Sequence, residues 1–516
     1  MHKYPIGIQN FQELREGGYV YVDKTQYFHQ LVTTGKYYFL SRPRRFGKSL
    51  MISTLQALFE GKKYLFKDLW IEEKWDFEQT NPTIIFNFND MSFNDIGVLK
   101  SINQSIHQEA QRHGLTLESE GLGSLFSELI REIHSKTGKK VVILIDEYDK
   151  PIIDFLEESK IEQGKANRDI LRDFYGVLKN ADEYLELVFI TGISKFSKVS
   201  IFSHLNNLQD ITLSPEYGTL TGYTQEEIEK YFEDYLQPIQ ERLQTTRKIL
   251  LDTMKTWYNG YSWDGVSRVY NPFGTLNFFH SKQFQNFWFA TGSPKFLIDQ
   301  MRRLEIFNVE NSIVNNAILD KYDLDNIELI PLLFQTGYLT VKELDIWTGD
   351  MVLDYPNKEV RETMYQFLID DIARNPHRMH TGRTIKDLNQ AFVTKDLEQV
   401  QTIINALLAD LPAETYQKSS EGLFHGLIHL IFSYLGVFVH SEVHSSQGRA
   451  DAVVETLTDV YIFEFKFNKT AQEAIDQIHK KKYAAKYQAS GKTITGIGVN
   501  FISAQKSVSE WLEVVL

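Results

Sequence analysis

Residues 37–50 read YYFLSRPRRFGKSL, and residues 141–149 read VVILIDEYD. In the first stretch, an apolar and aromatic run leads into a short loop, then Gly47-Lys48-Ser49, then a helical pattern. A buried strand, a loop and a helix in this order are typical of a phosphate-binding loop, whose backbone N–H groups and helix N-terminus cradle phosphates. We therefore expect Lys48 to reach the phosphates of ATP and Ser49 to hold Mg²⁺.

The second stretch completes the predicted nucleotide site. Five apolar residues precede Asp146-Glu147, and a buried strand that ends in Asp-Glu is the Walker B pattern. Asp146 is predicted to contact Mg²⁺ through water, and Glu147 to orient or deprotonate the attacking water. A third strand ends in Thr191, which is interpreted either as a sensor of the γ-phosphate or as the cap of a helix or loop.

The predicted loop departs from the usual GxxxxGK[ST] pattern, because Arg42 stands where that pattern has its first glycine. Arg44 and Arg45 follow, and Phe46 precedes the glycine. We expect these four residues to contribute to nucleotide binding. The alternative for the three arginines is a solvated basic turn.

The first 215 residues alternate short apolar runs with helical stretches, which predicts a parallel α/β sheet. The predicted strands are 37–41, 83–88, 141–145 and 187–191, and the predicted helices are 49–59, 98–113, 124–136 and 166–181.

The composition of the 516 residues is that of a globular protein, with 42% hydrophobic and 24% charged residues and a net charge of −13. The absence of cysteine excludes disulfides, thiol nucleophiles and Cys-ligated metal centres. No apolar run approaches the length that spans a bilayer, and the amino terminus has no secretory pattern. We expect a soluble cytoplasmic protein with no membrane partner.

The pattern of predicted helices and strands changes twice in the remainder of the chain. Thr224-Gln-Glu-Glu227 predicts a capping box at the start of a helix, and residues 332–340 predict a helix end, a glycine turn and a strand, as in a winged-helix unit. A second α/β pattern follows from about Tyr416. We therefore predict an α/β multidomain protein with a P-loop ATPase domain (1–218), a helical and winged-helix region (219–345), a helical connector (346–415) and a restriction-endonuclease-like α/β domain (416–516).

The carboxyl-terminal part contains a predicted hairpin over residues 450–467, which reads ADAVVETLTDVYIFEFKF. If it turns at Leu457-Thr458, Asp451 lies opposite Glu464, and Lys466 shares their face by the two-residue period of a strand. Two carboxylates and an ammonium suit Mg²⁺ or Mn²⁺ and the hydrolysis of phosphodiesters. The alternative is a cross-strand salt bridge on an exposed face.

The next predicted helix carries Gln477 and a cluster of lysines. Residues 466–492 hold seven lysines against Glu473 and Asp476, a local charge that suits a phosphate backbone. Glu421, just before an earlier predicted helix, is a further candidate ligand of the same cation.

Ten short motifs in this chain resemble those of bacterial and archaeal proteins with an amino-terminal AAA-ATPase-like domain and a carboxyl-terminal PD-(D/E)XK nuclease domain. They are YVDKT (21–25), RPRRFGKS (42–49), LIDEYDKP (144–151), TGISKFSKVSIFSHLNNL (191–208), WYNGY (257–261), VYNP (269–272), LLFQTGYL (332–339), GRAD (448–451), IFEFK (462–466) and QI…YAAKY (477–487).

The resemblance implies roles for individual residues. Arg42 belongs to the usual loop of this family. In the nuclease fold, the resemblance points to Glu421 or a neighbour as the acid of a helix, Asp451 and Glu464 as metal ligands, Lys466 as the catalytic lysine and Gln477 as a polar contact from the following helix.

These patterns favour an ATP-regulated, metal-dependent nuclease acting on DNA or RNA, with defence or the handling of mobile elements as a context. The alternatives are a nucleotide-driven switch or nucleic-acid scaffold with little cleavage, and an oligomeric DNA-translocating motor. The motor would need an arginine supplied in trans, for which Arg131, Arg168 and Arg172 are candidates.

Overall fold

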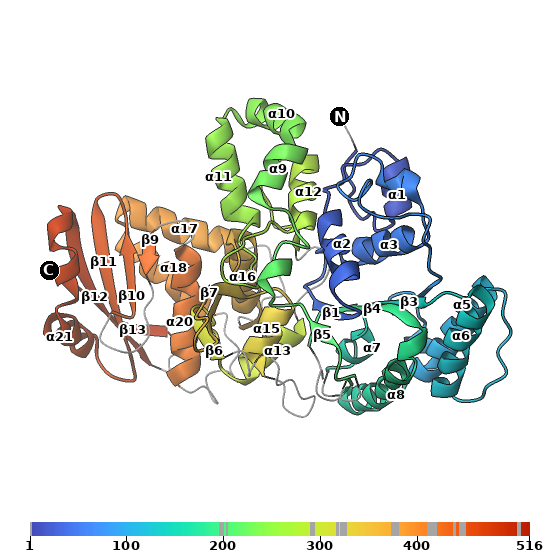
Figure 1. The fold of residues 1–516 in the computed structure, drawn as a ribbon. Helices are drawn as coiled ribbons and strands as arrows, with labels where there is room; N and C mark the ends of the chain where they lie inside the picture. Colours follow the sequence, from blue (N-terminus) through green and yellow to red (C-terminus); the bar gives the residue numbers. More distant parts are fainter. Residues whose placement is uncertain are drawn as a thin grey trace. The chain divides into compact units, whose positions relative to one another are not determined.

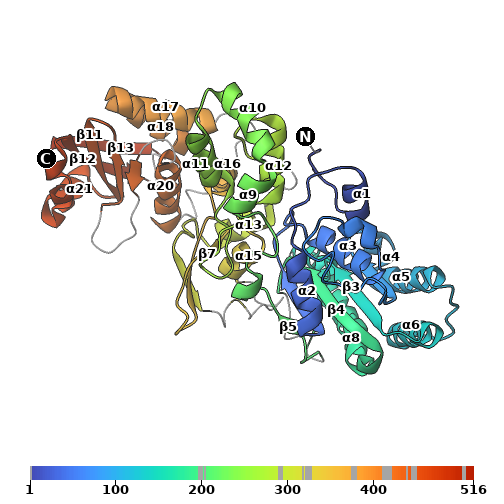
Figure 2. The same cartoon turned by 45° about the horizontal axis from the view of Figure 1, so that its top comes forward.

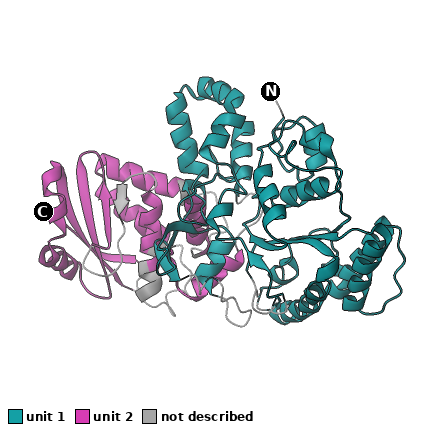
Figure 3. Cartoon of the chain, in the orientation of Figure 1, with its two compact units in different colours: residues 1–291, 310–359 teal, residues 292–309, 360–516 magenta. Residues whose placement is uncertain are grey.

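The fold is described from a computed structural model, in which the chain forms two compact units (Figure 3). Unit 1 comprises residues 1–291 and 310–359, and unit 2 comprises residues 292–309 and 360–516. The residues that the structure describes are 3–157, 159–195, 201–202, 205–288, 295–315, 319, 328–372, 381–409, 421–436, 440–442, 450–502 and 507–516.

Unit 1 contains a five-stranded parallel sheet of order β2-β3-β4-β1-β5 (Figure 1). All four predicted strands are confirmed, and a short fifth strand joins them at one edge. Their bounds are β1 Tyr37–Ser41, β2 Thr83–Asn87, β3 Val141–Asp146, β4 Leu185–Gly192 and β5 Gln209–Asp210. Every residue of β1 and β3 is buried, which is expected for a parallel sheet covered on both faces.

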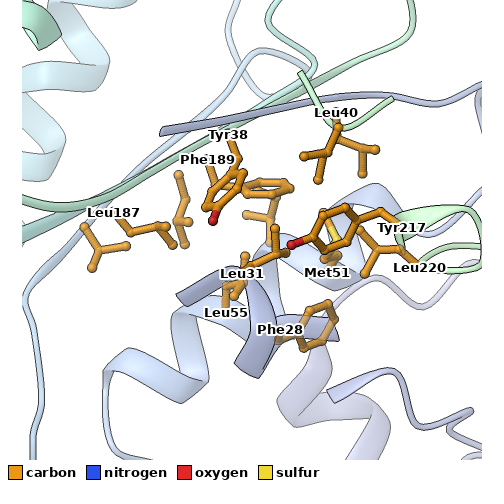
Figure 4. Close-up of a cluster of buried hydrophobic side chains, with 14 of the residues drawn as sticks. Phe28, Leu31, Tyr38, Leu40, Met51, Leu55, Leu187, Phe189, Tyr217 and Leu220 are labelled. Atoms are coloured by element: carbon orange, nitrogen blue, oxygen red, sulfur yellow. The ribbon is translucent and has the colours of Figure 1, made fainter. Parts of the chain in front are cut away.

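Helices cover both faces of this sheet. Alternate strand residues such as Tyr38 and Leu40 pack with Leu31 of α2 (Thr25–Thr34) and Leu55 of α3 (Lys48–Phe59) in one buried cluster (Figure 4). On the opposite face, Phe86 of β2 contacts Phe126 and Phe174, at centroid distances of 5.3 and 5.1 Å. This two-sided burial explains why the strands read as continuous apolar runs.

The predicted helices of this part are also confirmed. They are α3, α5 (Val98–Arg112), α6 (Leu122–Thr137) and α8 (Ile161–Asn180). Helix α5 contacts both α6 and β2, the edge strand of the sheet, and Figure 2 shows α5 and α6 side by side. Phe126 of α6 stacks on Phe174 of α8 at 4.6 Å, so these helices form one apolar layer.

The second part of unit 1 begins with the predicted capping box. Thr224 accepts a hydrogen bond from the backbone N–H of Glu227, and the Glu227 carboxylate accepts one from the N–H of Thr224. The predicted helix divides at Phe232 into α9 and α10. The helices here are α9 Gln225–Tyr231, α10 Glu233–Leu243, α11 Arg247–Tyr258 and α12 Pro272–Ser281.

A helix and a small antiparallel sheet complete unit 1. Helix α15 (Leu329–Gln335) is followed by a turn at Gly337 and by strand β7 (Thr340–Leu344), as the sequence predicts. Strands β6 (Ser312–Asn315) and β8 (Asp350–Asp354) complete the order β6-β8-β7. The chain separates into two units and residues 346–359 belong to the first, so the finer predicted division into four domains stays a prediction.

Unit 2 contains helices and a mixed sheet. Its helices include α13 (Lys295–Arg303), α17 (Thr381–Thr394), α18 (Leu397–Ala409) and α20 (Glu421–Leu435), and α16 (Lys358–Ile372) begins at the boundary with unit 1. Its sheet has the order β13-β12-β11-β10-β9, in which only β11 and β12 run parallel. The strands are β9 His440–Glu442, β10 Ala452–Glu455, β11 Asp459–Phe467, β12 Thr493–Ile502 and β13 Ser507–Val515. The structure thus has the predicted α/β multidomain class.

Helix α21 (Ala471–Lys481) packs against β11 and β12. The sequence predicts a helix over 471–488, but α21 ends earlier, because Lys482 takes a left-handed conformation with φ 53° and two short 3₁₀ turns follow. The close packing requires a glycine on β12, since a Cβ at Gly498 would lie 2.4 Å from the carbonyl oxygen of Ala471.

Gly498→Ala should therefore destabilise unit 2 by about 1–3 kcal/mol, because the helix must move off the sheet to admit the methyl group. Urea denaturation followed by circular dichroism would measure this. Gly176→Ala is the matched control: it lies in α8 with no atom within 4 Å of the added Cβ, and it should stabilise unit 1 slightly. Equal stability of Gly498→Ala and wild type would contradict the close helix–sheet contact.

Candidate functional site

The predicted phosphate loop connects β1 to α3. Gly47 takes a left-handed conformation, with φ 84°, immediately before Lys48 begins the helix. Lys48 is 4% exposed, and its ammonium donates to the carbonyl oxygens of Arg42 and Pro43, at 3.0 and 3.1 Å. The lysine therefore bridges the loop, in a position from which it can exchange these carbonyls for phosphate oxygens.

The carboxyl ends of the neighbouring strands meet beside this loop. Strand β4 lies between β1 and β3, so Thr191 is placed between the loop and Asp146. The Thr191 hydroxyl donates to Asp146 Oδ1 at 2.6 Å, and both side chains are buried. Neither lines the cavity described below. Thr191 thus fixes the orientation of the Asp146 carboxylate.

Glu147 follows Asp146 in a strained conformation. Its φ is 53°, a left-handed value that is unfavourable for a residue with a side chain. Such strain is concentrated at functional sites, where it aims a side chain that an unstrained backbone would direct elsewhere. Here Glu147 lines the same cavity as Lys48 and Ser49.

This cavity has a volume of about 380 Å³ and lies entirely in unit 1. One part of its wall is polar and includes Asn89, Glu147, Lys150 and the loop residues Arg44, Arg45, Phe46, Gly47, Lys48 and Ser49. Another part is apolar and comes from the amino-terminal segment and the second part of the unit, with Pro5, Ile6, Ile8, Val20, Val22, Tyr223, Phe273 and Leu276. A polar and an apolar wall suit a ligand with a phosphate chain and a flat base.

Two predicted binding residues of the loop direct their side chains elsewhere. Arg42 does not line the cavity and is fully buried, and its guanidinium donates to the carbonyl oxygens of Ser41, Thr212 and Tyr217. The Phe46 ring is 1% exposed and packs among aromatic rings. All described hydrogen bonds of the Arg42 guanidinium are to backbone carbonyls, so a role for Arg42 in nucleotide binding stays a prediction.

Arg44 and Arg45 remain available to a ligand. Both are exposed and line the cavity, and the Arg45 guanidinium lies over the Phe273 ring at 4.8 Å.

Asp149 is a site residue that the sequence reasoning missed. Its buried carboxylate accepts from the backbone N–H groups of Ile193 and Ser194, at 3.1 and 2.6 Å, and from the Ser194 hydroxyl. Burial raises its pKa to about 6, against the lowering effect of these hydrogen bonds. Asp149 therefore fixes the segment that leaves β4 just after Thr191. The second aspartate of the DEYD sequence is the signal that could have identified it.

In unit 2, the hairpin has the predicted register. Ala452 pairs with Phe463 and Val453 with Ile462, which places Asp451 opposite Glu464. Asp451 lies just before β10, and its carboxylate accepts from the backbone N–H of Phe465 at 2.8 Å. Phe463 and Phe465 alternate with Glu464 along the strand, and both are buried.

The predicted polar residues of this site are brought together. The Lys466 ammonium donates to Glu464 Oε1 at 2.8 Å and to Gln477 Oε1 at 2.9 Å, and the Gln477 amide donates to the same oxygen of Glu464. Gln477 belongs to α21, so the helix and the strand converge at this point.

Glu464 has the environment of a cation ligand. Burial, and secondly the Asp451 charge, raises its pKa to about 7, although Lys466 and Gln477 act in the opposite direction. Its Oε2 is buried and has no hydrogen-bond partner among the described residues. A divalent cation would relieve both the repulsion and the missing contact, so Asp451 and Glu464 fit such an ion.

A complete set of ligands does not emerge from the described residues, in which no three His, Cys, Asp or Glu side chains form a metal-binding group. Glu421 is the first residue of α20, but its side chain lies outside the described residues. Its predicted role as a ligand therefore stays a prediction. Gly448 and Arg449 of the GRAD motif also lie outside them.

Tyr483 is a second residue that the sequence reasoning missed. It lies just after α21, and its hydroxyl is 3.5 Å from the amide nitrogen of Gln477. Burial raises its pKa, with smaller contributions in the same direction from Glu464 and Asp451. The nearby lysines Lys480, Lys481, Lys482 and Lys486 are all exposed. They offer positive charge to a phosphate backbone.

Within the described ranges, no helix combines the length and the apolar composition needed to cross a bilayer.

Comparisons with known proteins match two parts of the chain to family models. A family model described as "Predicted AAA-ATPase" matches residues 5–202, and one described as the "PD-(D/E)XK nuclease superfamily" matches residues 419–511. A protein of Azotobacter chroococcum mcd 1, named "Uncharacterized protein in vnfD 5'region", is 36% identical over 518 residues, which cover 98% of each chain. The loop, the Walker B strand and the carboxylate hairpin lie inside the matched ranges. The chain therefore belongs to the family of predicted AAA-ATPases that also carry a carboxyl-terminal PD-(D/E)XK nuclease domain.

Proposed function

We propose that unit 1 binds and hydrolyses ATP. The observation that supports this most strongly is one cavity lined by Lys48 and Ser49, which follow β1, and by Glu147, which follows β3 of the same parallel sheet. Lys48 and the N-terminus of α3 would bind the phosphates, and Arg44 and Arg45 would add charge. The apolar wall would hold the base and ribose.

In this proposal each acidic residue has a separate role. Ser49 and Asp146 would hold Mg²⁺, which would neutralise charge on the β- and γ-phosphates. Glu147 would accept the proton of the attacking water, and its left-handed backbone supports the view that its direction matters. Thr191 and Asp149 would keep the carboxyl end of β4 in place.

We further propose that unit 2 cleaves nucleic acid, DNA or RNA, with Asp451, Glu464 and Glu421 holding Mg²⁺ or Mn²⁺. The ion would supply charge neutralisation at the phosphate and an acidified water. Lys466 would donate to the phosphate or the attacking water, Gln477 would position Lys466 and Glu464, and the exposed lysines after α21 would bind the backbone. Cytoplasmic location, nucleotide regulation of cleavage, a role in defence or mobile-element handling, and assembly into oligomers are further parts of the proposal.

Lys48→Ala should weaken ATP binding about 10- to 100-fold, because charge-assisted contacts of about 1.5–3 kcal/mol are lost. Glu147→Gln should retain ATP and slow its hydrolysis about 10²- to 10⁴-fold, because the water loses its base. Fluorescent-nucleotide titration and phosphate release measure the two effects. Lys179→Ala and Glu183→Gln, which change exposed residues, are the matched controls. Unchanged ATP affinity in Lys48→Ala would remove the phosphate-binding role of the loop.

Asp451→Ala should lower cleavage at least about a hundredfold and weaken Mn²⁺ binding, because a ligand is removed. Lys466→Ala should lose cleavage and keep Mn²⁺, because an ammonium is not a ligand. Cleavage of DNA and RNA panels, with ATP, a non-hydrolysable analogue and no nucleotide, and calorimetry with Mn²⁺ separate these roles. Asp476→Ala, an exposed acid on α21, is the control.

If the Asp451 variant cuts as well as wild type, the hairpin is a structural ion pair. Absence of cleavage by the wild type on every substrate would favour the switch or scaffold instead.

Asp149 should impose a pH dependence on the stability of unit 1. Its folded pKa of about 6 lies above the ordinary 3.8, so its contribution is full below about pH 3.8 and is lost as the pH rises through about 6. In Asp149→Asn, the free energy of unfolding should fall less than in wild type across this window, as followed by urea denaturation. Asp182→Asn should change the pH dependence of stability in the opposite sense. Lys36 and Tyr37 lower the pKa of Asp182, so its contribution to the free energy of unfolding is present above about pH 3.8 and is lost as the pH falls, and the variant lacks this contribution.

A further inference from the structure

The phosphate loop inserts its own aromatic side chain into a distant part of unit 1. The Phe46 ring packs against Tyr261, Trp263 and Trp288, at centroid distances of 4.8, 5.4 and 6.1 Å. We call these three residues the aromatic cluster. None of them belongs to the parallel sheet or to the helices that cover it. The side chain next to Gly47 is therefore held by a segment more than two hundred residues later in the sequence.

Arg42 reaches the same cluster from the other end of the loop. Its guanidinium lies over the Trp263 ring at 3.9 Å, while it donates to the carbonyl oxygens of Thr212 and Tyr217. Burial lowers the Arg42 pKa to about 9, and Asp210 and Asp264 act against this change, so the cation persists at neutral pH. A planar cation on an indole ring is a directional contact as well as an apolar one.

Two further contacts join the nucleotide edge to α15. A Cβ placed on Gly337, at the turn after α15, would lie 2.7 Å from Pro43 in the loop, so the turn and the loop touch. The backbone N–H of Lys195, in the segment after β4, donates to Gln335 Oε1 at 3.1 Å. The loop that would bind phosphates and the segment that follows Thr191 thus rest on the same small region.

Phosphate binding by such a loop needs backbone N–H groups, a glycine, a lysine and a hydroxyl. The side chains of Arg42 and Phe46 provide none of these, and each is at most 1% exposed. Each anchors one end of the residues whose N–H groups must converge on the phosphates. With the ring of Phe46 removed, the loop would populate other conformations. ATP affinity would then be reduced in proportion to the fraction of molecules whose loop keeps the phosphate-binding conformation.

We propose that Phe46 is a positioning residue for ATP: its packing in the aromatic cluster, together with Arg42 on Trp263, holds the loop in its phosphate-binding conformation. This inference rests on the proposed function, ATP binding at this loop. Because coupling between two sites is reciprocal, ATP must also tighten the aromatic cluster. The cluster therefore reports the nucleotide state to the helical and small-sheet part of unit 1.

The test compares full-length wild type with Phe46→Ala, Phe46→Leu and Phe126→Ala. Phe126 is the matched control, because it is equally buried but lies in α6 on the far face of the sheet. Thermal melting first establishes that each variant is folded. ATP affinity should then fall about tenfold or more in Phe46→Ala, recover in large part in Phe46→Leu, and stay unchanged in Phe126→Ala.

Hydrogen exchange of the wild type gives a second readout that needs no change at Phe46. ATP should slow amide exchange in residues 257–263 and 332–339, and Lys48→Ala should abolish the effect.

The outcomes separate the two proposals. If the wild type does not bind ATP, the proposed function fails. If the wild type binds ATP, but Phe46→Ala binds it equally well or exchange at 257–263 ignores ATP, then the aromatic cluster is ordinary packing and the inference is overturned. An equal loss of affinity in Phe126→Ala would also overturn it, because the effect would then follow from any buried cavity.

Discussion

The arrangement of unit 1 depends on one constraint: parallel strands present their carboxyl ends at the same edge of the sheet. Strands β1, β4 and β3 are neighbours, so the loop before Lys48, the Thr191 hydroxyl and Asp146 come together although they are far apart in sequence. The hydrogen bond from Thr191 to Asp146 then fixes that carboxylate, and Asp149 fixes the chain just beyond it. Glu147 is left to face the cavity.

In unit 2, the polar residues are brought together by a different constraint, the two-residue period of paired strands. The hairpin register places Asp451 opposite Glu464 and directs Phe463 and Phe465, on either side of Glu464, to the core. Burial raises the pKa of Glu464, and repulsion from the charge of Asp451 raises it further. The ammonium of Lys466 and the amide of Gln477 partly offset this repulsion. Such an arrangement is unfavourable without a cation, and that cost supports a functional role.

Much of this could be predicted from the sequence because the deciding signals are local. Apolar runs of strand length, a glycine before a helix, and alternation along a hairpin all act over a few residues, so the four parallel strands and the pairing of Asp451 with Glu464 followed directly. The position of Arg42 and Phe46 in the loop motif predicts that they contribute to nucleotide binding. Their true partners, Thr212, Tyr217 and the aromatic cluster, lie too far along the chain for a local pattern to indicate them.

The sequence by itself therefore determined the α/β class, the four longer strands of the parallel sheet with the helices between them, and the identity of the residues at those strand ends. Only the tertiary structure decided where long side chains go. Lys48 folds back on its loop, Arg42 turns to a tryptophan ring, and Tyr483 reaches Gln477 from beyond the end of α21. Backbone pattern follows from hydrogen bonding between near neighbours, whereas the direction of a flexible side chain depends on which distant surface removes it from water.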